Sequence, residues 1–202
     1  MSAPVIVGFS GSFSTPSNTR VLVEEAVKRT VARFKRSSET YDLSQFGSDL
    51  GSARNLLGIS APGRHIVERI THAKALVIAC PVYKGSYPGL FKHLFDLLDP
   101  NCLVGKPILL AAVGSGEKHA LVVEHHLRPL FGFFEAQTLA TGVYACTTDF
   151  AEGKLVSSAV NERLDRAVGQ LAPYLERSLQ HEFTFDNVTP LRPYQENLSA
   201  VF

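Results

Sequence analysis

The stretch Val5–Thr19, VIVGFSGSFSTPSNT, joins an apolar run to a loop rich in hydroxyl groups. A short run that is apolar throughout is typical of a strand in a parallel sheet that is covered on both faces. The segment Thr19–Arg33 follows directly and places Val23, Val27 and Val31 on one stripe, as an amphipathic helix does. The stretch therefore predicts a strand, a turn and a helix, the opening unit of an α/β domain.

The same alternation continues along the chain. Further strands are expected at Ser38–Ser44, Ala75–Cys80, Pro107–Val113 and Ala136–Ala145. Helices are expected at Gly63–His72, Pro88–Leu98, Glu117–Phe134 and Val160–Leu179. Together these predict an α/β, flavodoxin-like three-layer sandwich: a five-stranded parallel sheet of order 2-1-3-4-5 with helices on both faces.

Length and composition exclude several classes of function. The 202 residues fit one domain, residues 1–180, with a C-terminal tail, residues 181–202, that packs on the domain or on a neighbouring subunit. A net charge of +1 is not the strongly basic balance that is typical of proteins that bind nucleic acid. We expect no membrane span and no signal peptide, and three scattered cysteines fit a reducing, cytoplasmic location.

In such a sheet, ligands bind beyond the carboxyl ends of the strands, where the strand order reverses. The loop after Phe9 lacks the lysine of a Walker loop and the third glycine of a dinucleotide fingerprint. It offers hydroxyl groups at a helix N-terminus, where N–H groups favour an anion such as a phosphate monoester. A plain polar loop with an N-cap at Ser17 or Thr19 remains the alternative.

Two further loops reach the same crevice. After the third strand, Pro81–Ser86 must turn sharply, and its N–H groups suit the edge of a flat heteroaromatic ring that Tyr83 or Tyr87 partly covers. After the fourth strand, Gly114–Gly116 lets the backbone approach a ligand closely. Either loop could instead be an ordinary strand-to-helix turn. A phosphatase loop would need an arginine six residues after Cys80, and this chain has Ser86 there. Cys80 is therefore expected to be a small buried apolar residue.

These loops resemble a known family. The motifs GS…SNT, PVYKGSYPGLFKHLFDLL (residues 81–98) and GSGEKHALVVEHHLRPLF (residues 114–131) are similar to those of the NAD(P)H-dependent FMN reductases. The branch that serves alkanesulfonate and methanesulfonate monooxygenases is the most similar. The resemblance runs from about Val5 to about Ala145.

The resemblance implies two ligands, FMN and NAD(P)H, and a set of FMN-binding residues. The phosphate positions are Ser12, Ser14, Ser17, Asn18 and Thr19; the ring positions are Pro81, Val82, Tyr83, Lys84, Gly85, Ser86, Gly114, Ser115 and Gly116. The family often has an arginine where this chain has Ser14, which implies a loosely held flavin. No catalytic residue is assigned, because hydride transfer between stacked rings needs little acid–base help.

The segment Glu117–Phe134 carries His119, His125 and His126, but no HExxH or paired-cysteine pattern accompanies them, so we expect no metal site. Its apolar residues occupy more than one face, which favours a subunit contact and a homodimer or homotetramer. Relatives of this kind carry a π-bulge here, at or next to His125, and Pro129 should kink the helix.

Three functions follow as expectations. The first is an NAD(P)H:FMN oxidoreductase that supplies reduced FMN to a partner flavin-dependent monooxygenase in sulfonate desulfurisation. The second is an enzyme with resident FMN that reduces quinones or similar acceptors. The third is a flavodoxin-type electron carrier, which the near-neutral net charge disfavours.

Overall fold

The computed structural model describes residues 5–176, and the C-terminal tail predicted at residues 181–202 lies outside them. The main strands are β1 (Ile6–Ser10), β2 (Ser38–Asp42), β3 (Ala75–Pro81) and β4 (Pro107–Gly114). The main helices are α1 (Asn18–Phe34), α2 (Ala61–His72), α3 (Gly89–Asp96), α4 (Arg128–Phe133), α5 (Ser158–Gly169) and α6 (Ala172–Leu175). Short 3-10 turns, η1 (Leu43–Phe46), η2 (Asp49–Ser52) and η3 (Leu56–Gly58), join β2 to α2.

The strands form one parallel sheet in the predicted order. β1 lies between β2 and β3, and β4 follows on the far side of β3. The strand order therefore reverses between β1 and β3. The loops after these two strands lie at the same edge of the sheet, at its carboxyl end. The predicted flavodoxin-like architecture is confirmed.

The fifth strand differs from the prediction of one continuous strand, Ala136–Ala145. Two short strands, β5 (Gln137–Thr138) and β6 (Val143–Cys146), pair in parallel with different parts of β4. Side chains hold the segment between them: Arg128 donates to the carbonyl of Leu139 at 3.0 Å, and the side chain of Gln170 accepts from the N–H of Thr141 at 3.0 Å. These bonds replace the strand pairing.

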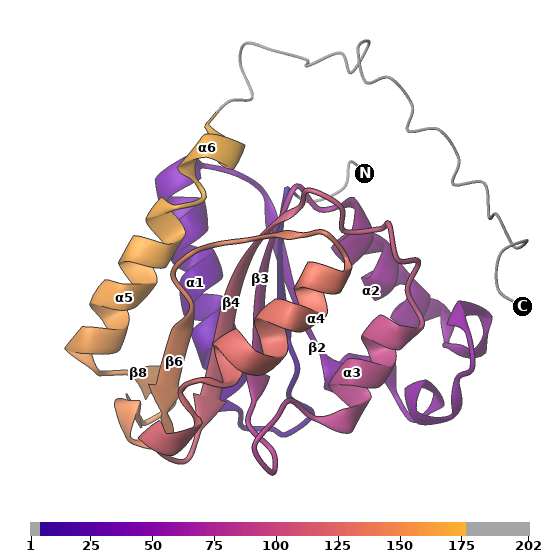
Figure 1. Ribbon diagram of the computed structural model, residues 1–202, viewed down its shortest axis with the longest axis horizontal. Helices are drawn as coiled ribbons and strands as arrows, with labels where there is room; N and C mark the ends of the chain where they lie inside the picture. The colour runs from indigo at the N-terminus through magenta and orange to yellow at the C-terminus, as the bar shows by residue number, and fades with distance from the viewer. Residues whose placement is uncertain (1–4, 177–202) are drawn as a thin grey trace, which may run out of the picture.

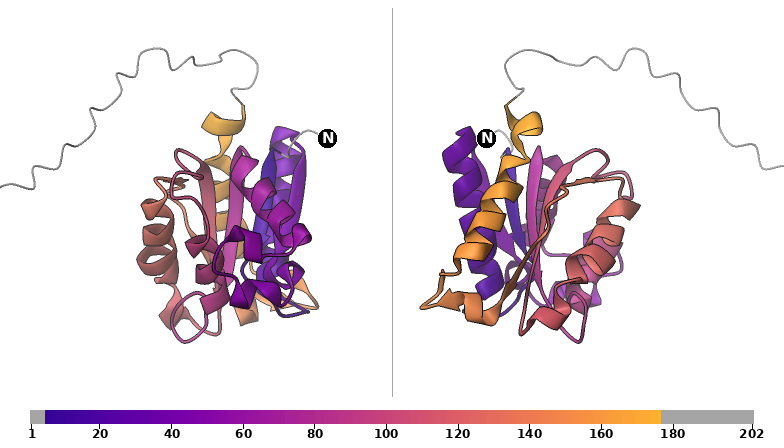
Figure 2. Two further views of the ribbon diagram at one scale, coloured as in Figure 1. Left: turned by 90° about the vertical axis from the view of Figure 1, so that its right-hand side faces the viewer. Right: turned by 60° about the vertical axis from the view of Figure 1, so that its left-hand side comes forward.

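Helices cover both faces of the sheet. Alternate residues of β3 show the two layers: Leu76 and Ile78 pack with α2, α3 and α4, whereas Val77 and Ala79 pack with α1 and α5. Figure 1 shows α4 in front of the sheet, and the turned views of Figure 2 show the strands between α1 and α4. Both faces are apolar because both are buried.

The predicted helix Glu117–Phe134 is not one regular helix. It consists of a 3-10 turn, η4 (Glu117–His119), a π-helical turn, η5 (Val123–Leu127), and then α4. The π-turn includes His125, which confirms the π-bulge expected there. Pro129, which has no N–H to donate, is the second residue of α4 and follows this π-turn directly.

The predicted helix Val160–Leu179 is also divided. α5 ends at Gly169, and α6 begins after Leu171 with Pro173 in its first turn. Before α5 the chain forms a small antiparallel hairpin of β7 (Phe150–Ala151) and β8 (Lys154–Leu155), preceded by the 3-10 turn η6 (Thr147–Asp149). The sequence patterns located these helices correctly but not their interruptions.

An ion pair joins β2 to α2 and gives the fold a pH dependence. Arg69 donates to both carboxylate oxygens of Glu39, at 2.5 and 2.8 Å, and Tyr41 donates to one of them. The hydrogen bonds from Arg69 lower the pKa of Glu39 from 4.5 to about 2. Because the folded-state pKa is depressed, the pair stabilises above the unfolded pKa and is lost as the pH falls through about 2.

We therefore expect Glu39→Gln to lower the free energy of unfolding at pH 7 by about 1 kcal/mol, since the pair is partly exposed and screened. The difference from wild type should shrink between pH 4.5 and about 2, where the wild-type carboxylate becomes protonated. Urea unfolding of the wild type and of the Glu39→Gln variant at several pH values measures this difference. A difference that stayed constant across this range would contradict the assignment.

Candidate functional site

The first loop, residues 11–17, leaves β1 in close contact with its neighbours. The N–H of Gly11 donates to the carbonyl of Ala79 in β3 at 2.7 Å. A Cβ atom at position 11 would lie 2.5 Å from Cδ2 of Phe91, so glycine alone fits this approach. Ser12 is almost fully buried, and its hydroxyl accepts from the N–H of Ser14 at 3.2 Å. The loop is thus fixed where it meets the sheet.

Helix α1 starts where this loop ends. Ser17 is the N-cap, and its hydroxyl accepts from the N–H of Arg20 at 3.2 Å. The N–H groups of Asn18 and Thr19 have no acceptor within the helix. No acidic residue stands in the first turn, and the Arg20 guanidinium is held by Asp42 at 2.7 Å. The positive end of the helix dipole is therefore free to attract an anion.

The second loop is a two-residue turn with a strained tip. Tyr83 and Ser86 exchange both backbone hydrogen bonds, at 2.8 and 3.1 Å. Lys84 and Gly85 between them have φ values of 51° and 86°, the left-handed conformation of a type I′ turn. The hydroxyl of Ser86 also bonds to Nδ1 of His126 at 3.0 Å, which ties the turn to η5. The ring of Tyr83 remains 42% exposed.

The third loop, Gly114–Gly116, is fixed by Tyr144 of β6. The Tyr144 hydroxyl donates to the carbonyl of Gly116 at 2.6 Å. A Cβ atom on Gly114 would overlap that hydroxyl, so the glycine makes room for the bond. Partial burial raises the pKa of Tyr144 further above neutral pH, in keeping with a hydroxyl that donates.

The three loops enclose one cavity of about 440 Å³ at the carboxyl edge of the sheet, the flavin-sized cavity. Most of the residues predicted for FMN line it: Ser12, Ser14, Ser17, Asn18, Thr19, Pro81, Val82, Tyr83, Gly114 and Ser115. The structure thus brings together residues that are up to about a hundred positions apart in the chain.

Four predicted residues do not line this cavity. Lys84 forms the tip of the second loop, and Gly85 faces a neighbouring cavity. Ser86 is engaged with His126, and the carbonyl of Gly116 is engaged with Tyr144. For Lys84 and Gly85 the reason is local, because a tight turn directs its central residues away from the strand end.

The cavity also has lining residues that sequence reasoning missed: Pro16, Val113 and Thr147. Thr147 follows β6, which occupies the fifth-strand position beside β4. The rule that selected the loops after β1, β3 and β4 applies equally to this strand end. The hydroxyl-bearing sequence CTTDF, residues 146–150, was the available signal.

The residues of the flavin-sized cavity fit FMN. Its hydroxyl and N–H donors at the start of α1 suit a phosphate monoester, and Pro81, Val82 and Tyr83 offer apolar surface and an aromatic ring for the isoalloxazine. No residue that lines the cavity is charged. A carboxylate would repel the phosphate and a guanidinium would retain it, and the cavity has neither.

The structure also bears on the chemistry that the sequence analysis set aside. Burial raises the pKa of the Cys80 thiol to about 12, so Cys80 behaves as the small buried residue expected. Within residues 5–176, no three histidine, cysteine, aspartate or glutamate side chains lie close enough together to hold a metal ion. Across the same residues, no helix has the length and apolar character needed to cross a membrane.

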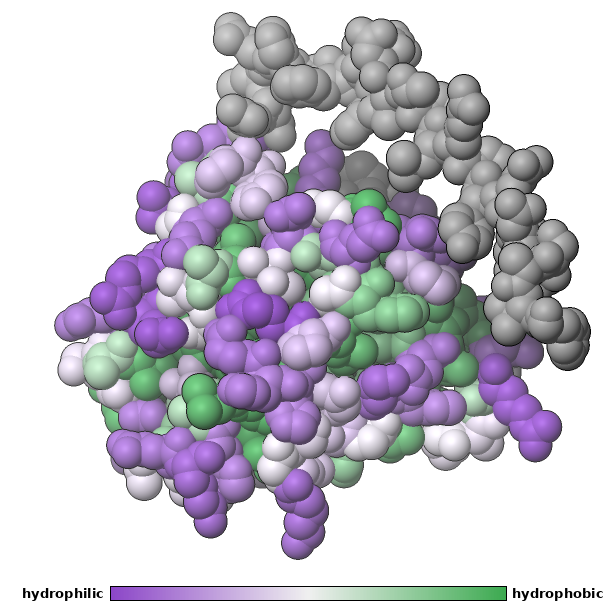
Figure 3. All heavy atoms as spheres, viewed as in Figure 1, coloured by the Kyte–Doolittle hydropathy of each residue, from purple (hydrophilic) through white to green (hydrophobic). Residues whose placement is uncertain are grey.

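A second cavity, of about 540 Å³, lies between α3 and the η5–α4 segment. Its lining includes Tyr87, Phe95, His125, Pro129 and Phe133. Figure 3 shows apolar surface beside α4 on this face, and the Phe133 side chain is 68% exposed. An apolar face of this kind agrees with the subunit contact expected for this segment. The contact itself stays a prediction.

Comparisons with known proteins cover most of the chain. The family model described as NADPH-dependent FMN reductase matches residues 4–151. The chain is 42% identical over 174 residues to the NADH-dependent FMN reductase SfnF of Pseudomonas fluorescens, covering 86% of this chain and 93% of that one. It is 41% identical over 168 residues to an FMN reductase (NADPH) of Pseudomonas aeruginosa, covering 83% of this chain and 90% of that one.

The fold has a similar solved structure as well. An oxidoreductase from Corynebacterium diphtheriae superposes with a TM-score of 0.76 at 32% identity, covering 87% of this chain and 98% of that one.

Proposed function

The chain belongs to the NADPH-dependent FMN reductases, and from that membership we propose that it releases reduced FMN to a partner flavin-dependent monooxygenase. As a member of the family it is an oxidoreductase that uses FMN and NAD(P)H. In this proposal FMN enters the flavin-sized cavity as an exchangeable substrate, and the monooxygenase is one of sulfonate desulfurisation.

The observation that carries the proposal is the absence of charge on the cavity wall. N–H and hydroxyl donors hold the phosphate through hydrogen bonds to a charged group, worth about 1.5–3 kcal/mol each. No arginine or lysine among the lining residues adds a fixed ion pair. Such a site binds FMN specifically through its phosphate and still lets the flavin leave.

The chain's residues have simple tasks in the reaction. FMN, when bound, supplies a ring that accepts a hydride from the nicotinamide. Pro81, Val82 and Tyr83 would cover part of that ring with apolar and aromatic surface. The backbone of the Gly114–Gly116 loop would lie at another edge, where an N–H group could stabilise negative charge. The Tyr144 hydroxyl fixes this third loop by its hydrogen bond to the carbonyl of Gly116. No side chain has to move a proton.

Turnover measurements on desalted protein test the proposal. We expect NADH or NADPH oxidation only when free FMN is added, with a rate that saturates as FMN rises. A yellow protein whose rate ignores added FMN would show a resident flavin and would favour quinones or similar acceptors. No turnover under either condition would favour an electron carrier.

Tyr83→Ala should weaken FMN binding about tenfold, because a ring stacked on an aromatic side chain gains roughly 1–3 kcal/mol. Quenching of flavin fluorescence measures the affinity. Tyr174→Ala is the matched control, since Tyr174 in α6 is 41% exposed against 42% for Tyr83 and lies outside the cavity. Equal affinities of the two variants would remove Tyr83 from the ring site.

A further inference from the structure

A third cavity, of about 330 Å³, adjoins the flavin-sized cavity at the same edge of the sheet. Its lining residues are Gly85, Lys118, His119, Leu121, Val122, His125 and His126. The same two loops line both cavities. In the loop after β3, Tyr83 lines the flavin-sized cavity and Gly85 lines the third cavity. After β4, Ser115 lines the flavin-sized cavity and Lys118 lines the third cavity. The two cavities therefore lie at different parts of the same two loops.

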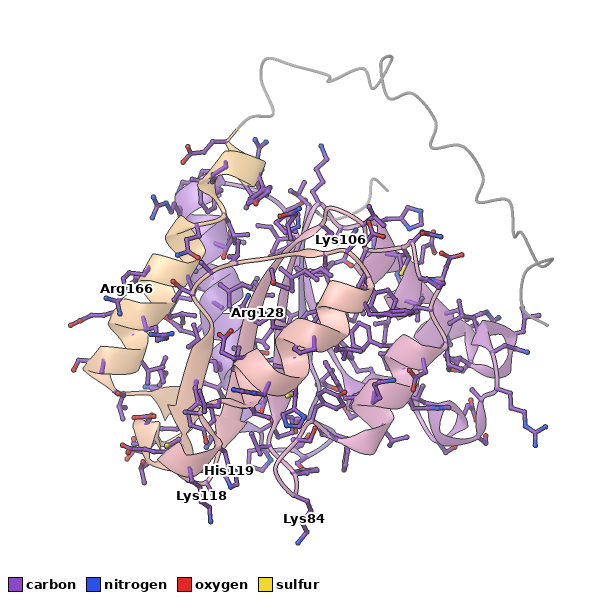
Figure 4. The ribbon with its side chains drawn as sticks, viewed as in Figure 1. Lys84, Lys106, Lys118, His119, Arg128 and Arg166 are labelled. Carbon is purple, nitrogen blue, oxygen red and sulfur yellow. The ribbon has the colours of Figure 1, made fainter. Side chains whose placement is uncertain are left out.

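The third cavity is cationic, whereas the flavin-sized cavity is uncharged. Lys118 and His119 come from η4, and Lys84 stands at the tip of the turn next to Gly85. Figure 4 shows Lys84, Lys118 and His119 at the same lower edge of the molecule, and Figure 3 shows hydrophilic side chains projecting there. Two protein segments thus bring three basic groups to one opening, which favours an anion.

Little negative charge offsets this cluster. Among the ion pairs of residues 5–176, none includes Lys84 or Lys118. The carboxylate of Glu124 in η5 is bound by Arg128 at 2.6 and 2.9 Å, and this pairing lowers the pKa of Glu124. Two neighbouring carboxylates make no ion pair among residues 5–176: Glu117, which is exposed at the start of η4, and Asp149, which accepts from the N–H of Cys146.

The position of the cluster indicates which anion it takes. The phosphate of FMN is assigned to the start of α1, on the other side of the flavin ring, so it does not reach Lys118. The nicotinamide must stack on that ring for hydride transfer. The first charged group beyond the nicotinamide ribose is the pyrophosphate, which NADH and NADPH share.

We propose that Lys118, His119 and the cavity they line bind the pyrophosphate of NADH or NADPH while the nicotinamide lies over the flavin. This inference rests on the proposed assignment of FMN to the flavin-sized cavity. His126, held by Ser86, fixes η5 against the flavin loop, so the ring site and the pyrophosphate site keep a constant separation.

The test compares three variants of the full chain. Lys118→Ala removes the charge, Lys118→Arg keeps it, and Arg166→Ala removes one exposed charge on α5, far from the opening (Figure 4). Calorimetric titration with ADP-ribose, which has the pyrophosphate but no nicotinamide, gives a binding constant without turnover. Steady-state kinetics give KM values for NADH, NADPH and FMN.

For Lys118→Ala we expect the Kd of ADP-ribose and the KM values of both NADH and NADPH to rise about tenfold, with the KM of FMN unchanged. Lys118→Arg and Arg166→Ala should remain close to wild type. The proposal is overturned if wild type does not bind ADP-ribose, if the loss is confined to NADPH, or if the KM of FMN rises in parallel.

Failure of the proposed function would look different. In that case wild type would not oxidise NADH or NADPH with added FMN, whatever the state of Lys118. The ADP-ribose titration would still decide the pyrophosphate site, because it needs neither flavin nor turnover.

Discussion

Ser14→Asp is expected to weaken FMN binding roughly 100-fold, and Ser14→Arg to strengthen it about tenfold. Ser14 lines the flavin-sized cavity beside the start of α1, and its side chain is exposed. Two unit charges about 4 Å apart near a protein surface interact by roughly 4 kcal/mol, and exposure at this position reduces that to roughly 2–3 kcal/mol. An aspartate would oppose the phosphate, whereas an arginine would add the cation that relatives often have here.

Ser14→Asn is the neutral control, and riboflavin, which lacks the phosphate, is the control ligand. Fluorescence quenching with FMN and with riboflavin gives all the affinities needed. The charge series should change FMN binding in the order Asp, Asn, Arg and leave riboflavin binding nearly constant. A series that moved both ligands equally would place the phosphate elsewhere.

Phe95→Ala is expected to lower the free energy of unfolding by about 3–5 kcal/mol, the cost of a large buried cavity. Phe95 in α3 is almost fully buried and contacts the rings of Phe91, Phe131 and Phe134, with centroids 4.9, 5.0 and 6.2 Å away. It also meets Phe9 of β1 at 6.4 Å. One side chain therefore joins α3, α4 and the sheet beneath the second loop.

Leu57→Ala is the control, because Leu57 is 84% exposed and its loss should cost less than about 0.5 kcal/mol. Urea unfolding followed by circular dichroism compares the two variants with wild type. Similar losses for both would mean that Phe95 does not anchor this layer of the core.

The regular parts of the fold could be predicted because their patterns are local. Apolar runs such as Ala75–Cys80 and the stripe of Val23, Val27 and Val31 specify a strand and a helix without reference to the rest of the chain. Once the strands are parallel, the chemistry of the loops after β1, β3 and β4 must meet at one edge.

The interruptions could not be predicted because distant side chains cause them. The break between β5 and β6 depends on Arg128 and Gln170, which lie in other elements. The loss of Ser86 and Gly116 from the cavity depends on His126 and Tyr144 in the same way. Sequence spacing shows which loop a residue belongs to, but not which distant residue forms a hydrogen bond with it.

The affinities of the desalted wild-type protein for FMN and for riboflavin test the central claim most directly. Because several N–H and hydroxyl donors at the start of α1 are assigned to the phosphate, FMN should bind at least about 100-fold more tightly than riboflavin. Equal affinities would contradict the account, since the cavity would then hold the flavin by its ring alone.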